Sequence, residues 1–306
     1  MRTAILGAGA LGSVIGALLA RGGRDVALWD IDDQHLTAVN ANGLILDGPD
    51  GRDVVRMPAL RPEHATETPD LIILLTKTTH TETALDGVAK HIDAGAHVLT
   101  LQNGLGNAER VAQKVPKAQV LYGCTLMPGR FIAPGHVATQ GDGFAVFRPL
   151  LPEGTAFAEC VAANVKDLAL TLSDGTDIII WQKAAFNCAM NACAALTGAR
   201  VGELGDRPDM QDLLHGVAAE VTAVARAREV PVDDADVRDQ IAHALAHHTE
   251  HKPSMLQDLE AGRTTEIDSL CAEVSRQAGA VGVPAPLNEA LAALVTLRSD
   301  LAQRRT

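Results

Sequence analysis

A polar stripe stands out among apolar residues in the second half of the chain. Lys183, Asn187 and Asn191 follow one another at intervals of four residues, with Trp181 just before them. On a helix this spacing places the three side chains on one face. Because an amine and two amides buried without partners would cost stability, the stripe must face either water or a polar cleft. Lys183 is the only charged residue between positions 178 and 199, which favours the cleft.

Such a stripe has the chemistry that reduction of a carbonyl group requires. When a hydride adds to the carbonyl carbon, the oxygen becomes an alkoxide that a positioned acid must stabilise and protonate. Lys183 can act as this acid, and desolvation in a cleft would lower its pKa toward the working range. The two asparagines can hold a substrate hydroxyl or carbonyl without adding charge.

A glycine-rich loop near the N-terminus predicts a dinucleotide site. It matches the pattern G-x-G-x-x-G and consists of Gly7, Ala8, Gly9, Ala10, Leu11 and Gly12. The first glycine allows a tight turn, the second lets a pyrophosphate approach the backbone, and the third lets the following helix pack on the sheet. A glycine turn without a ligand is the alternative. The strand-like run before the loop and the helical pattern after it favour the dinucleotide.

Asp30 suggests which dinucleotide this is. It ends the second strand-like run, eighteen residues after Gly12. A carboxylate there can accept both ribose hydroxyls of NAD and would repel the 2′-phosphate of NADP. Asp32 and Asp33 add to that repulsion, and no Arg or Lys lies between positions 24 and 52. The sequence therefore predicts NAD(P)H with NADH favoured over NADPH, the alternative being that Asp30 is a solvated turn carboxylate.

The elements that must position these residues alternate in the first half of the chain. Short apolar runs predict strands at residues 3–6, 25–29, 71–75, 97–101, 120–123, 136–140 and 144–147. Helical patterns lie at residues 11–21 and 81–91. The alternation predicts an α/β fold, in which a doubly wound Rossmann sheet ends in an antiparallel piece. The glycines around residue 142 predict a hairpin between the last two runs.

The second half of the chain is predicted to be all-helical. Helical patterns cover residues 178–199, 210–229, 236–251, 265–280 and 288–303, and prolines separate the later ones. We place the domain boundary near residues 167–176. This gives an NAD(P)-binding Rossmann domain at residues 1–170 and a helical substrate and catalytic domain at residues 171–306.

Length and charge agree with this division. The chain has 306 residues, of which 26 are basic and 38 acidic, so the net charge is −12. The length fits two domains, and 47% hydrophobic with 21% charged residues indicates a globular protein. The negative charge argues against a nucleic-acid partner, because a polyphosphate would be repelled. A small site can still bind an anionic substrate through its own local charge.

The cysteines and the apolar segments predict the compartment. Five dispersed cysteines form no C-x-x-C pair, which fits free thiols in a reducing environment. Residues 3–20 are uncharged, but their four glycines and strand-like start fit a signal peptide poorly. No other segment is long enough to span a bilayer. We therefore expect a cytoplasmic protein without a membrane partner.

Several motifs together resemble the ketopantoate reductase (2-dehydropantoate 2-reductase) family. They are GAGALGS at residues 7–13, Lys77 in LLTKT, QNGLGN at 102–107, W-x-K-x-x-x-N-x-x-x-N at 181–191 and PSMLQDLEAGRTTEID at 253–268. The resemblance runs nearly end to end in the order and spacing of the family. It implies an oxidoreductase with an N-terminal Rossmann domain, a helical C-terminal domain and a catalytic cleft between them.

The resemblance also implies residue roles in the helical domain. Lys183 would be the general acid, and Glu266 would hydrogen-bond the reacting hydroxyl or the lysine. Asn187 and Asn191 would orient the oxygens of the substrate. Ser254 would bind the substrate near its carboxylate.

Two further residues would lie at the cofactor and substrate ends of the cleft, namely Lys77 and Asn103. Each site residue outside the stripe also has a structural alternative. Ser254 could be a helix N-cap after a proline, and Glu266 a surface charge on the helix at residues 265–280. Lys77 could cap a strand edge, and Asn103 could belong to a plain turn.

The reaction predicted from the resemblance is the reduction of ketopantoate to pantoate, a step of pantothenate biosynthesis. Two departures leave the substrate open. The family commonly uses NADPH and often has a basic residue where this chain has Asp30, and residues 125–134 look less typical of it. The alternatives are a relative that acts on another 2-oxo acid and a nicotinamide-binding protein without turnover. The oligomeric state stays open, with a homodimer as the candidate.

Three histidines form a weaker pattern. His243, His247 and His251 are spaced by four residues near Glu250, which could bind zinc or nickel. No cysteine lies nearby and no H-E-x-x-H motif is present. We therefore expect solvated helix histidines and no metal site.

Overall fold

The computed structural model describes residues 1–141, 143–165 and 169–304. The chain divides into two compact units, one made of Met1–Gln102 and Asn107–Thr176, the other of Asn103–Gly106 and Asp177–Thr306. The division falls at positions 176/177, a few residues beyond the expected 170/171, and part of the expected boundary (residues 167 and 168) lies outside the described residues. The second unit also takes in a four-residue loop from the first half of the chain.

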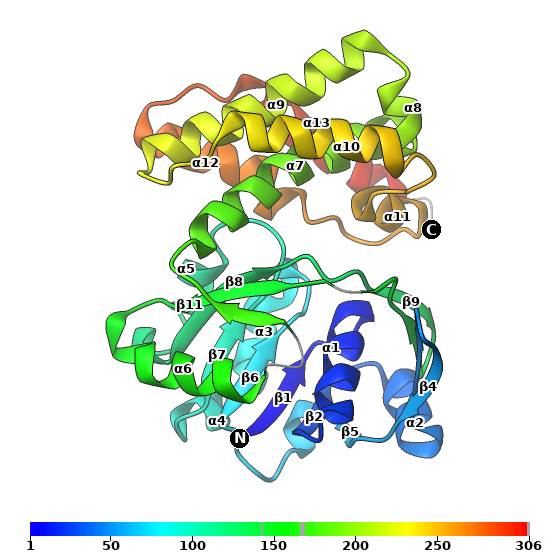
Figure 1. Cartoon of the computed structure of the whole chain (residues 1–306), viewed down its shortest axis with the longest axis vertical. Helices are drawn as coiled ribbons and strands as arrows, with labels where there is room; N and C mark the ends of the chain where they lie inside the picture. The colour runs from blue at the N-terminus through cyan, green and yellow to red at the C-terminus, as the bar shows by residue number, and fades with distance from the viewer. Residues whose placement is uncertain (142, 166–168, 305–306) are drawn as a thin grey trace. The chain divides into compact units, whose positions relative to one another are not determined.

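The first unit is built on a mostly parallel eight-stranded sheet with the order β12-β11-β8-β7-β6-β1-β2-β5 (Figure 1). Its strands are β1 Arg2–Leu6, β2 Asp25–Trp29, β5 Ala59–Leu60, β6 Leu71–Leu74, β7 His97–Thr100, β8 Val120–Thr125, β11 Ala145–Pro149 and β12 Leu170–Leu172. β11 runs antiparallel to β8, while β12 runs parallel to β11. The predicted α/β class with an antiparallel piece at the end of the sheet is confirmed.

Alternate residues of the central strands are buried on opposite faces of the sheet. Ile5, Leu28 and Ile73 lie in one core with residues of α1, α2 and α6. Leu6 and Ile72 lie in the other, with residues of α3, α4 and α5. The helices of this unit are α1 Ala10–Arg21, α2 Asp33–Asn42, α3 Thr81–Gly87, α4 Ala89–Asp93, α5 Asn107–Val111 and α6 Thr155–Asn164. Burial on both faces explains why the strands are continuous apolar runs.

The hairpin predicted around residue 142 is wrong, and Asp142 itself lies outside the described residues. β10 (His136–Ala138) belongs to a separate four-stranded sheet with the order β4-β3-β10-β9, whereas β11 pairs with β8 in the large sheet. The other strands of the small sheet are β3 Leu44–Gly48, β4 Gly51–Val55 and β9 Arg130–Ala133. β10 pairs with β3, which buries Val137 beside Leu44 and Leu46. Each run thus pairs with a partner distant in sequence, which a local turn signal does not reveal.

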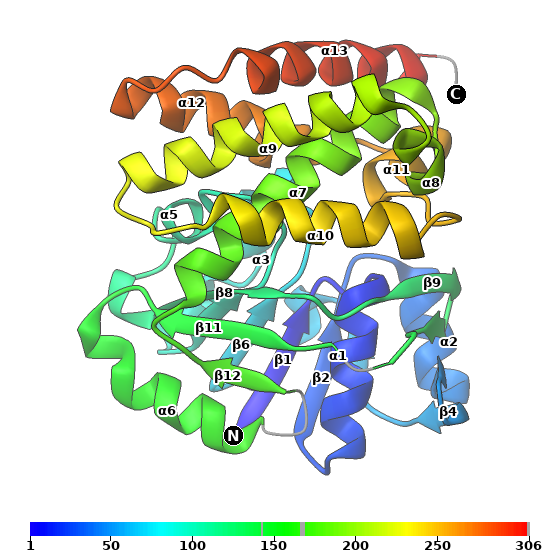
Figure 2. The same ribbon diagram turned by 45° about the horizontal axis from the view of Figure 1, so that its top comes forward.

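The second unit is helical, as predicted, and its helices surround α7 (Figure 2). Its helices are α7 Thr176–Thr197, α8 Val201–Gly205, α9 Pro208–Ala227, α10 Asp234–His247, α11 Ser254–Glu260, α12 Cys271–Val281 and α13 Pro286–Gln303. Ala185, Ala189 and Ala192 of α7 are fully buried. Such small side chains let the neighbouring helices approach closely.

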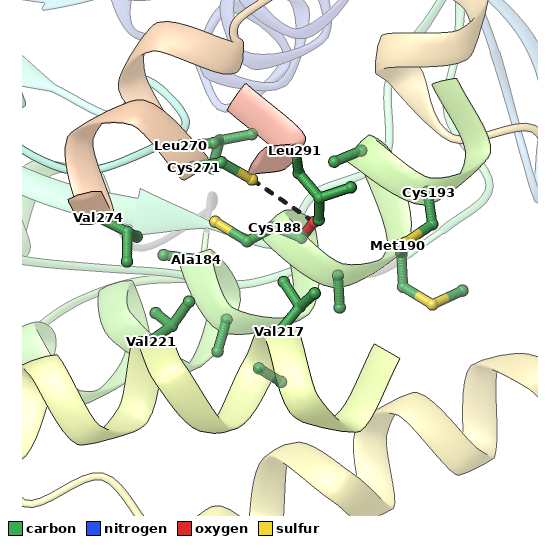
Figure 3. Close-up of a cluster of buried hydrophobic side chains, with 14 of the residues drawn as sticks. Ala184, Cys188, Met190, Cys193, Val217, Val221, Leu270, Cys271, Val274 and Leu291 are labelled. Atoms are coloured by element: carbon green, nitrogen blue, oxygen red, sulfur yellow. Dashed lines mark hydrogen bonds between the residues drawn. The ribbon is translucent and has the colours of Figure 1, made fainter. Parts of the chain in front are cut away.

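Buried thiols lie at the centre of this helical core. Figure 3 shows Cys188 of α7 among Val217, Val221 and Leu291, with the Cys271 thiol donating a hydrogen bond to the Cys188 carbonyl at 3.7 Å. All five cysteines are free. Burial raises the pKa of Cys193 to about 12, so this thiol stays protonated and behaves as a small apolar group.

Two predicted helix bounds in this unit are wrong. The helix expected at residues 265–280 begins only at Cys271, because Ile267–Ser269 form a 3₁₀ turn. The Ser269 carbonyl accepts the Leu105 N–H at 2.8 Å, a long-range bond that a sequence pattern does not show. The helix expected at residues 236–251 ends at His247. Over the described ranges, no helix combines the length and apolar character needed to cross a bilayer.

Replacement of Phe147 tests the core of the first unit. Phe147 is fully buried in β11, so Phe147→Ala should lower the free energy of unfolding by about 3–5 kcal/mol through lost burial and an unfilled cavity. Phe144→Ala is the control, because that ring is 44% exposed and its loss should cost less than about 1 kcal/mol. Urea denaturation measures both, and equal losses would contradict this packing.

Candidate active site

The glycine loop forms a tight turn between β1 and α1. Gly7 has φ +101°, and a Cβ there would lie 2.5 Å from the Thr76 nitrogen. A Cβ on Gly12 would lie 2.0 Å from the Gly7 carbonyl oxygen. Gly9, at the N-cap of α1, is exposed and has no described atom within 4 Å of such a Cβ. Two glycines are therefore required by packing, while the third leaves an open approach to the helix N-terminus.

Asp30 lies beside this turn, at the end of β2. Its carboxylate accepts the Ala8 N–H at 2.6 Å and the N–H groups of Ile31 and Asp32 at 2.7 and 3.0 Å. The contact with Ala8 fixes the carboxylate next to the glycine loop. Asp30 is thus held by the backbone and does not behave as a mobile turn carboxylate.

A cation that the sequence analysis missed lies close to this edge. Arg61 donates to the Ile31 carbonyl at 3.0 Å and forms a bidentate pair with Asp33 at 2.7 and 2.8 Å. The guanidinium lowers the pKa of Asp33. Asp33 therefore has a local counter-ion, and its charge adds less to the repulsion of a 2′-phosphate than expected. No sequence motif links Arg61 to residue 33, and only their contact in the folded chain reveals the pair.

Lys77 follows β6 at the same edge of the sheet. It occupies the N-cap position of the short 3₁₀ turn Thr78–His80 and is half-buried. The preceding Thr76 packs against Gly7, and the Gln102 amide donates to the Thr76 carbonyl at 2.8 Å. The predicted cofactor residues of the first unit thus come from neighbouring strand ends, where ligands bind in open α/β sheets.

Asn103 is placed in the second unit by the residues that follow it. Leu105 is buried in the helical core, and Gly104 has φ +91°. A Cβ on Gly104 would lie 2.3 Å from the Ser269 carbonyl oxygen, so no larger residue fits. This loop delivers the Asn103 side chain to Lys183, whose Nζ donates to Asn103 Oδ1 at 2.6 Å.

A small hollow gathers most of the residues predicted for substrate binding. It is lined by Asn103, Asn187, Asn191, Ser254, Met255, Asp258, Glu266 and Leu270. Lys183 joins this group through its bond to Asn103. An ammonium, three amides, a hydroxyl and carboxylates are thus collected in one helical unit. Such a set can hold a small polar substrate and donate a proton to it.

Asn191 links two elements of the hollow. Its Oδ1 accepts the Ser254 hydroxyl at 3.3 Å and the Met255 N–H at 3.2 Å. Asn191 is 6% exposed, so these bonds satisfy a buried amide oxygen. The N-cap alternative for Ser254 is wrong, because Pro253 occupies the N-cap position and the Ser254 side chain reaches Asn191 instead.

Glu266 lies outside a helix. It precedes the 3₁₀ turn and is half-buried at the wall of the hollow, so the interpretation as a surface charge on a helix is wrong. Asp258 is a lining residue that the sequence analysis missed. Its carboxylate accepts Arg263 Nε at 2.9 Å. A lone carboxylate between the buried Leu256 and Leu259 was the available signal.

The predicted site residues fall into two groups, which the structure describes separately. In the first unit are Gly7, Ala8, Gly9, Ala10, Leu11, Gly12, Asp30 and Lys77; in the second are Asn103, Lys183, Asn187, Asn191, Ser254 and Glu266.

The three spaced histidines do not share one helix. His243 and His247 lie on α10 with their rings 4.3 Å apart, but His251 lies beyond the end of the helix. Across the part of the chain that the structure describes, no group of three His, Cys, Asp or Glu side chains could hold a metal ion.

Substitutions in the glycine loop should separate packing from accessibility. Gly12→Ala should lower the free energy of unfolding by about 1–3 kcal/mol, because its Cβ meets backbone. Gly9→Ala should change it by less than about 0.5 kcal/mol, because the space beside Gly9 is open. Urea denaturation measures both. A larger loss for Gly9→Ala than for Gly12→Ala would show that the turn has another geometry.

Comparisons with known proteins agree with this arrangement. The family model for "Ketopantoate reductase PanE/ApbA" matches residues 3–151, and the model for its C-terminal domain matches residues 177–299. A 2-dehydropantoate 2-reductase of Pyrococcus abyssi is 34% identical over 299 residues, covering 96% of this chain and 97% of the relative.

Two solved structures are similar along almost the whole chain. One is D-mandelate dehydrogenase with NADH and anilino(oxo)acetate, with a TM-score of 0.93, 28% identity and 99% coverage of both chains. The other is a PanE/ApbA family ketopantoate reductase from Ralstonia eutropha, with a TM-score of 0.90, 32% identity and coverage of 99% and 100%. Matches to both domain models and to a full-length relative above 30% identity show that the chain belongs to the ketopantoate reductase family of oxidoreductases.

Proposed function

We propose that the chain reduces a 2-oxo acid to the 2-hydroxy acid with NAD(P)H, and that ketopantoate is the first candidate substrate. The observation that carries this proposal is the polar hollow of the second unit, with Lys183 held by Asn103 at 2.6 Å. The name 2-dehydropantoate 2-reductase, given to the Pyrococcus abyssi relative, supports ketopantoate.

We assign cofactor binding to residues 1–170 and substrate binding with catalysis to residues 171–306, together with the loop Asn103–Gly106. The residues at the glycine loop fit a dinucleotide, because the space beside Gly9 is open where a pyrophosphate would approach the N-terminus of α1. Asp30 would accept the ribose hydroxyls, and Lys77 would lie at the nicotinamide end of the cofactor. A bound reduced nicotinamide supplies the hydride for C2 of the substrate.

Lys183 donates the proton in this mechanism. As the hydride reaches C2, negative charge develops on the carbonyl oxygen, and the Nζ ammonium stabilises and then protonates it. Asn103 holds Nζ in place through its amide oxygen. Glu266 is proposed to orient the reacting hydroxyl or the ammonium, since its carboxylate lines the same hollow.

The remaining polar residues hold the substrate. Asn187 and Asn191 present amides from successive turns of α7, and Ser254 presents a hydroxyl from the start of α11. We assign Ser254 to the carboxylate end of the substrate. Asn191 reaches both Ser254 and the backbone of Met255, so it also fixes α11 relative to the lysine.

A different 2-oxo acid is the second candidate substrate. The similarity to D-mandelate dehydrogenase favours it, because mandelate is also a 2-hydroxy acid. NADH as the preferred cofactor stays part of the proposal and rests on Asp30. A nicotinamide-binding protein without turnover is less well supported, because amides and carboxylates line one hollow and the Lys183 ammonium donates to one of those amides.

We further propose a homodimer and a cytoplasmic location. Leu294, Leu297 and Leu301 form an exposed apolar stripe on α13 with 53%, 57% and 42% exposure. Two copies of one helix stripe can pack against each other around a twofold axis. The five free cysteines support a reducing compartment.

Replacement of Lys183 tests the proposed reaction. Lys183→Ala should lower kcat for reduction of the best 2-oxo acid by about 10²–10⁴-fold while NADH still binds, because only the proton donor is lost. The assay follows consumption of NADH with a panel that includes ketopantoate and phenylglyoxylate. Gln182→Ala is the control, because Gln182 bonds Asp236 instead of lining the hollow. A Lys183→Ala enzyme with most of its rate would refute the mechanism. A wild-type chain that binds NADH but reduces no acid would favour the protein without turnover.

Replacement of Asp30 tests the cofactor preference. Asp30→Asn keeps an oxygen for the Ala8 N–H but removes the charge, so kcat/KM with NADPH relative to NADH should rise by about tenfold. Asp30→Arg should raise the ratio further. The control is Asp25→Asn, at the opposite end of β2, which should leave the ratio unchanged. If both Asp30 variants keep the wild-type ratio, Asp30 does not face the ribose.

A further inference from the structure

A buried histidine links the small sheet to the glycine loop. His35, in the first turn of α2, is 1% exposed. Its Nδ1 accepts the Gly135 N–H at 3.0 Å, and its Nε2 lies 3.1 Å from the hydroxyl of Ser13. The Ser13 hydroxyl in turn donates to the Ala8 carbonyl at 2.7 Å. This chain of hydrogen bonds runs from the β9–β10 turn into the dinucleotide loop.

The direction of each bond follows from the partners. The Gly135 N–H can only donate, so Nδ1 must carry a lone pair. Ser13 uses its single proton on the Ala8 carbonyl, so its oxygen must accept from Nε2–H. The network is therefore complete only for the neutral imidazole with its proton on Nε2. A protonated ring would place an Nδ1–H against the Gly135 N–H and leave a buried donor without its acceptor.

The same network fixes both backbone groups of Ala8. The Ala8 carbonyl accepts from Ser13, while the Ala8 N–H donates to Asp30 at 2.6 Å. Asp32 caps α2 by accepting the His35 backbone N–H at 3.1 Å, which sets the position of the ring. Gly135 has φ +74°, and a Cβ there would lie 2.8 Å from Ala38 Cβ, so only glycine brings its N–H this close to α2.

We propose that His35 is a positioning residue of the cofactor site: the neutral ring holds the glycine loop through Ser13, and its protonation releases the loop and weakens dinucleotide binding in acid. This inference rests on the proposed function, because it assumes that the loop binds a dinucleotide. His35 itself touches neither cofactor nor substrate in this scheme.

The charges around the ring act in opposite directions. Burial lowers the pKa of His35, whereas the carboxylates of Asp30 and Asp32 raise it by a smaller amount. Among the residues that the structure describes, the other groups that face the ring are uncharged, namely the Ser13 hydroxyl, the Gly135 N–H and the Phe131 ring at 5.2 Å. Since the folded-state pKa is below the usual value of about 6.5, the unfolded chain takes up the proton first as pH falls. The stability that the neutral ring contributes is complete above about pH 6.5 and declines below it.

Two substitutions of His35 by an amide residue can each keep one of its two hydrogen bonds and remove the other. His35→Asn places an oxygen near the position of Nδ1 and can keep the Gly135 bond, but it does not reach Ser13. His35→Gln places an NH₂ near the position of Nε2 and can keep the Ser13 bond. Neither amide titrates. His97→Gln is the matched control, because His97 is also a histidine of this unit with a pKa lowered by burial, but it stacks on Phe157 away from the loop.

The experiment measures the dissociation constant of NAD⁺, which is stable in acid, between about pH 5 and pH 8 for all four proteins. Wild type and His97→Gln should bind more weakly toward the acid end of this range, at a pH below the usual histidine pKa of about 6.5, because burial lowers the pKa of His35 in the folded chain. His35→Asn should weaken binding at neutral pH by about tenfold, and His35→Gln by less than about threefold, both with a flatter pH profile than wild type. Thermal unfolding shows that each variant is folded.

A second measurement does not depend on the cofactor. Nitrogen NMR of the imidazole ring of the apo protein should show the Nε2–H tautomer. As the ring is protonated, the protection of the Ala8 amide against hydrogen exchange, relative to its intrinsic rate at each pH, should fall. The opposite tautomer, or the same pH profile in wild type and both His35 variants, would overturn the role of His35. A wild-type chain with the expected tautomer but no affinity for NAD⁺ would instead overturn the proposed function, and this inference with it.

Discussion

The hydrogen bond from the Leu105 N–H to the Ser269 carbonyl is the contact on which the geometry of the proposed site depends. It anchors a four-residue loop of the first half of the chain in the helical unit, where the Leu105 side chain is buried in the apolar core. The loop then carries Asn103 to the Lys183 ammonium. The same bond occupies a carbonyl just before α12 and helps to set the helix start at Cys271. One backbone contact thus positions both Asn103, the hydrogen-bond partner of Lys183, and the segment that holds Glu266.

Sequence patterns are sufficient to predict the elements that depend only on residues near each other in the sequence. Apolar runs buried on both sheet faces identified the central strands, and the glycine loop predicted the turn between β1 and α1. The stripe on α7 was predictable because a spacing of four residues fixes side chains to one helix face. The small four-stranded sheet was not predicted, because β10 is paired with β3 about ninety residues earlier in the chain. A turn signal next to a strand does not specify that partner.

Residues that depend on spatial neighbours were missed for the same reason. Asp258 is a lone charge between buried leucines, and only the folded chain shows that its partner is Arg263 and that it faces the hollow. Arg61 lies far from Asp33 in sequence and yet forms a bidentate pair with it. His35 belongs to no recognisable motif, although its partner Ser13 is the last residue of the glycine-rich motif GAGALGS. In each case the sequence shows the type of residue, but only the folded structure shows which residue it pairs with.

The central position of α7 couples the packing of the helical core to the hollow. One side of this helix carries the buried alanines of the core. The other side carries two amides that line the hollow and the Lys183 amine, which is bonded to Asn103. A bulkier side chain in place of one of these alanines would displace α7, and the polar side chains of the helix would move with it. Substitutions in the interior of the helical unit would therefore move the polar groups of the hollow as well as lower the stability of the fold.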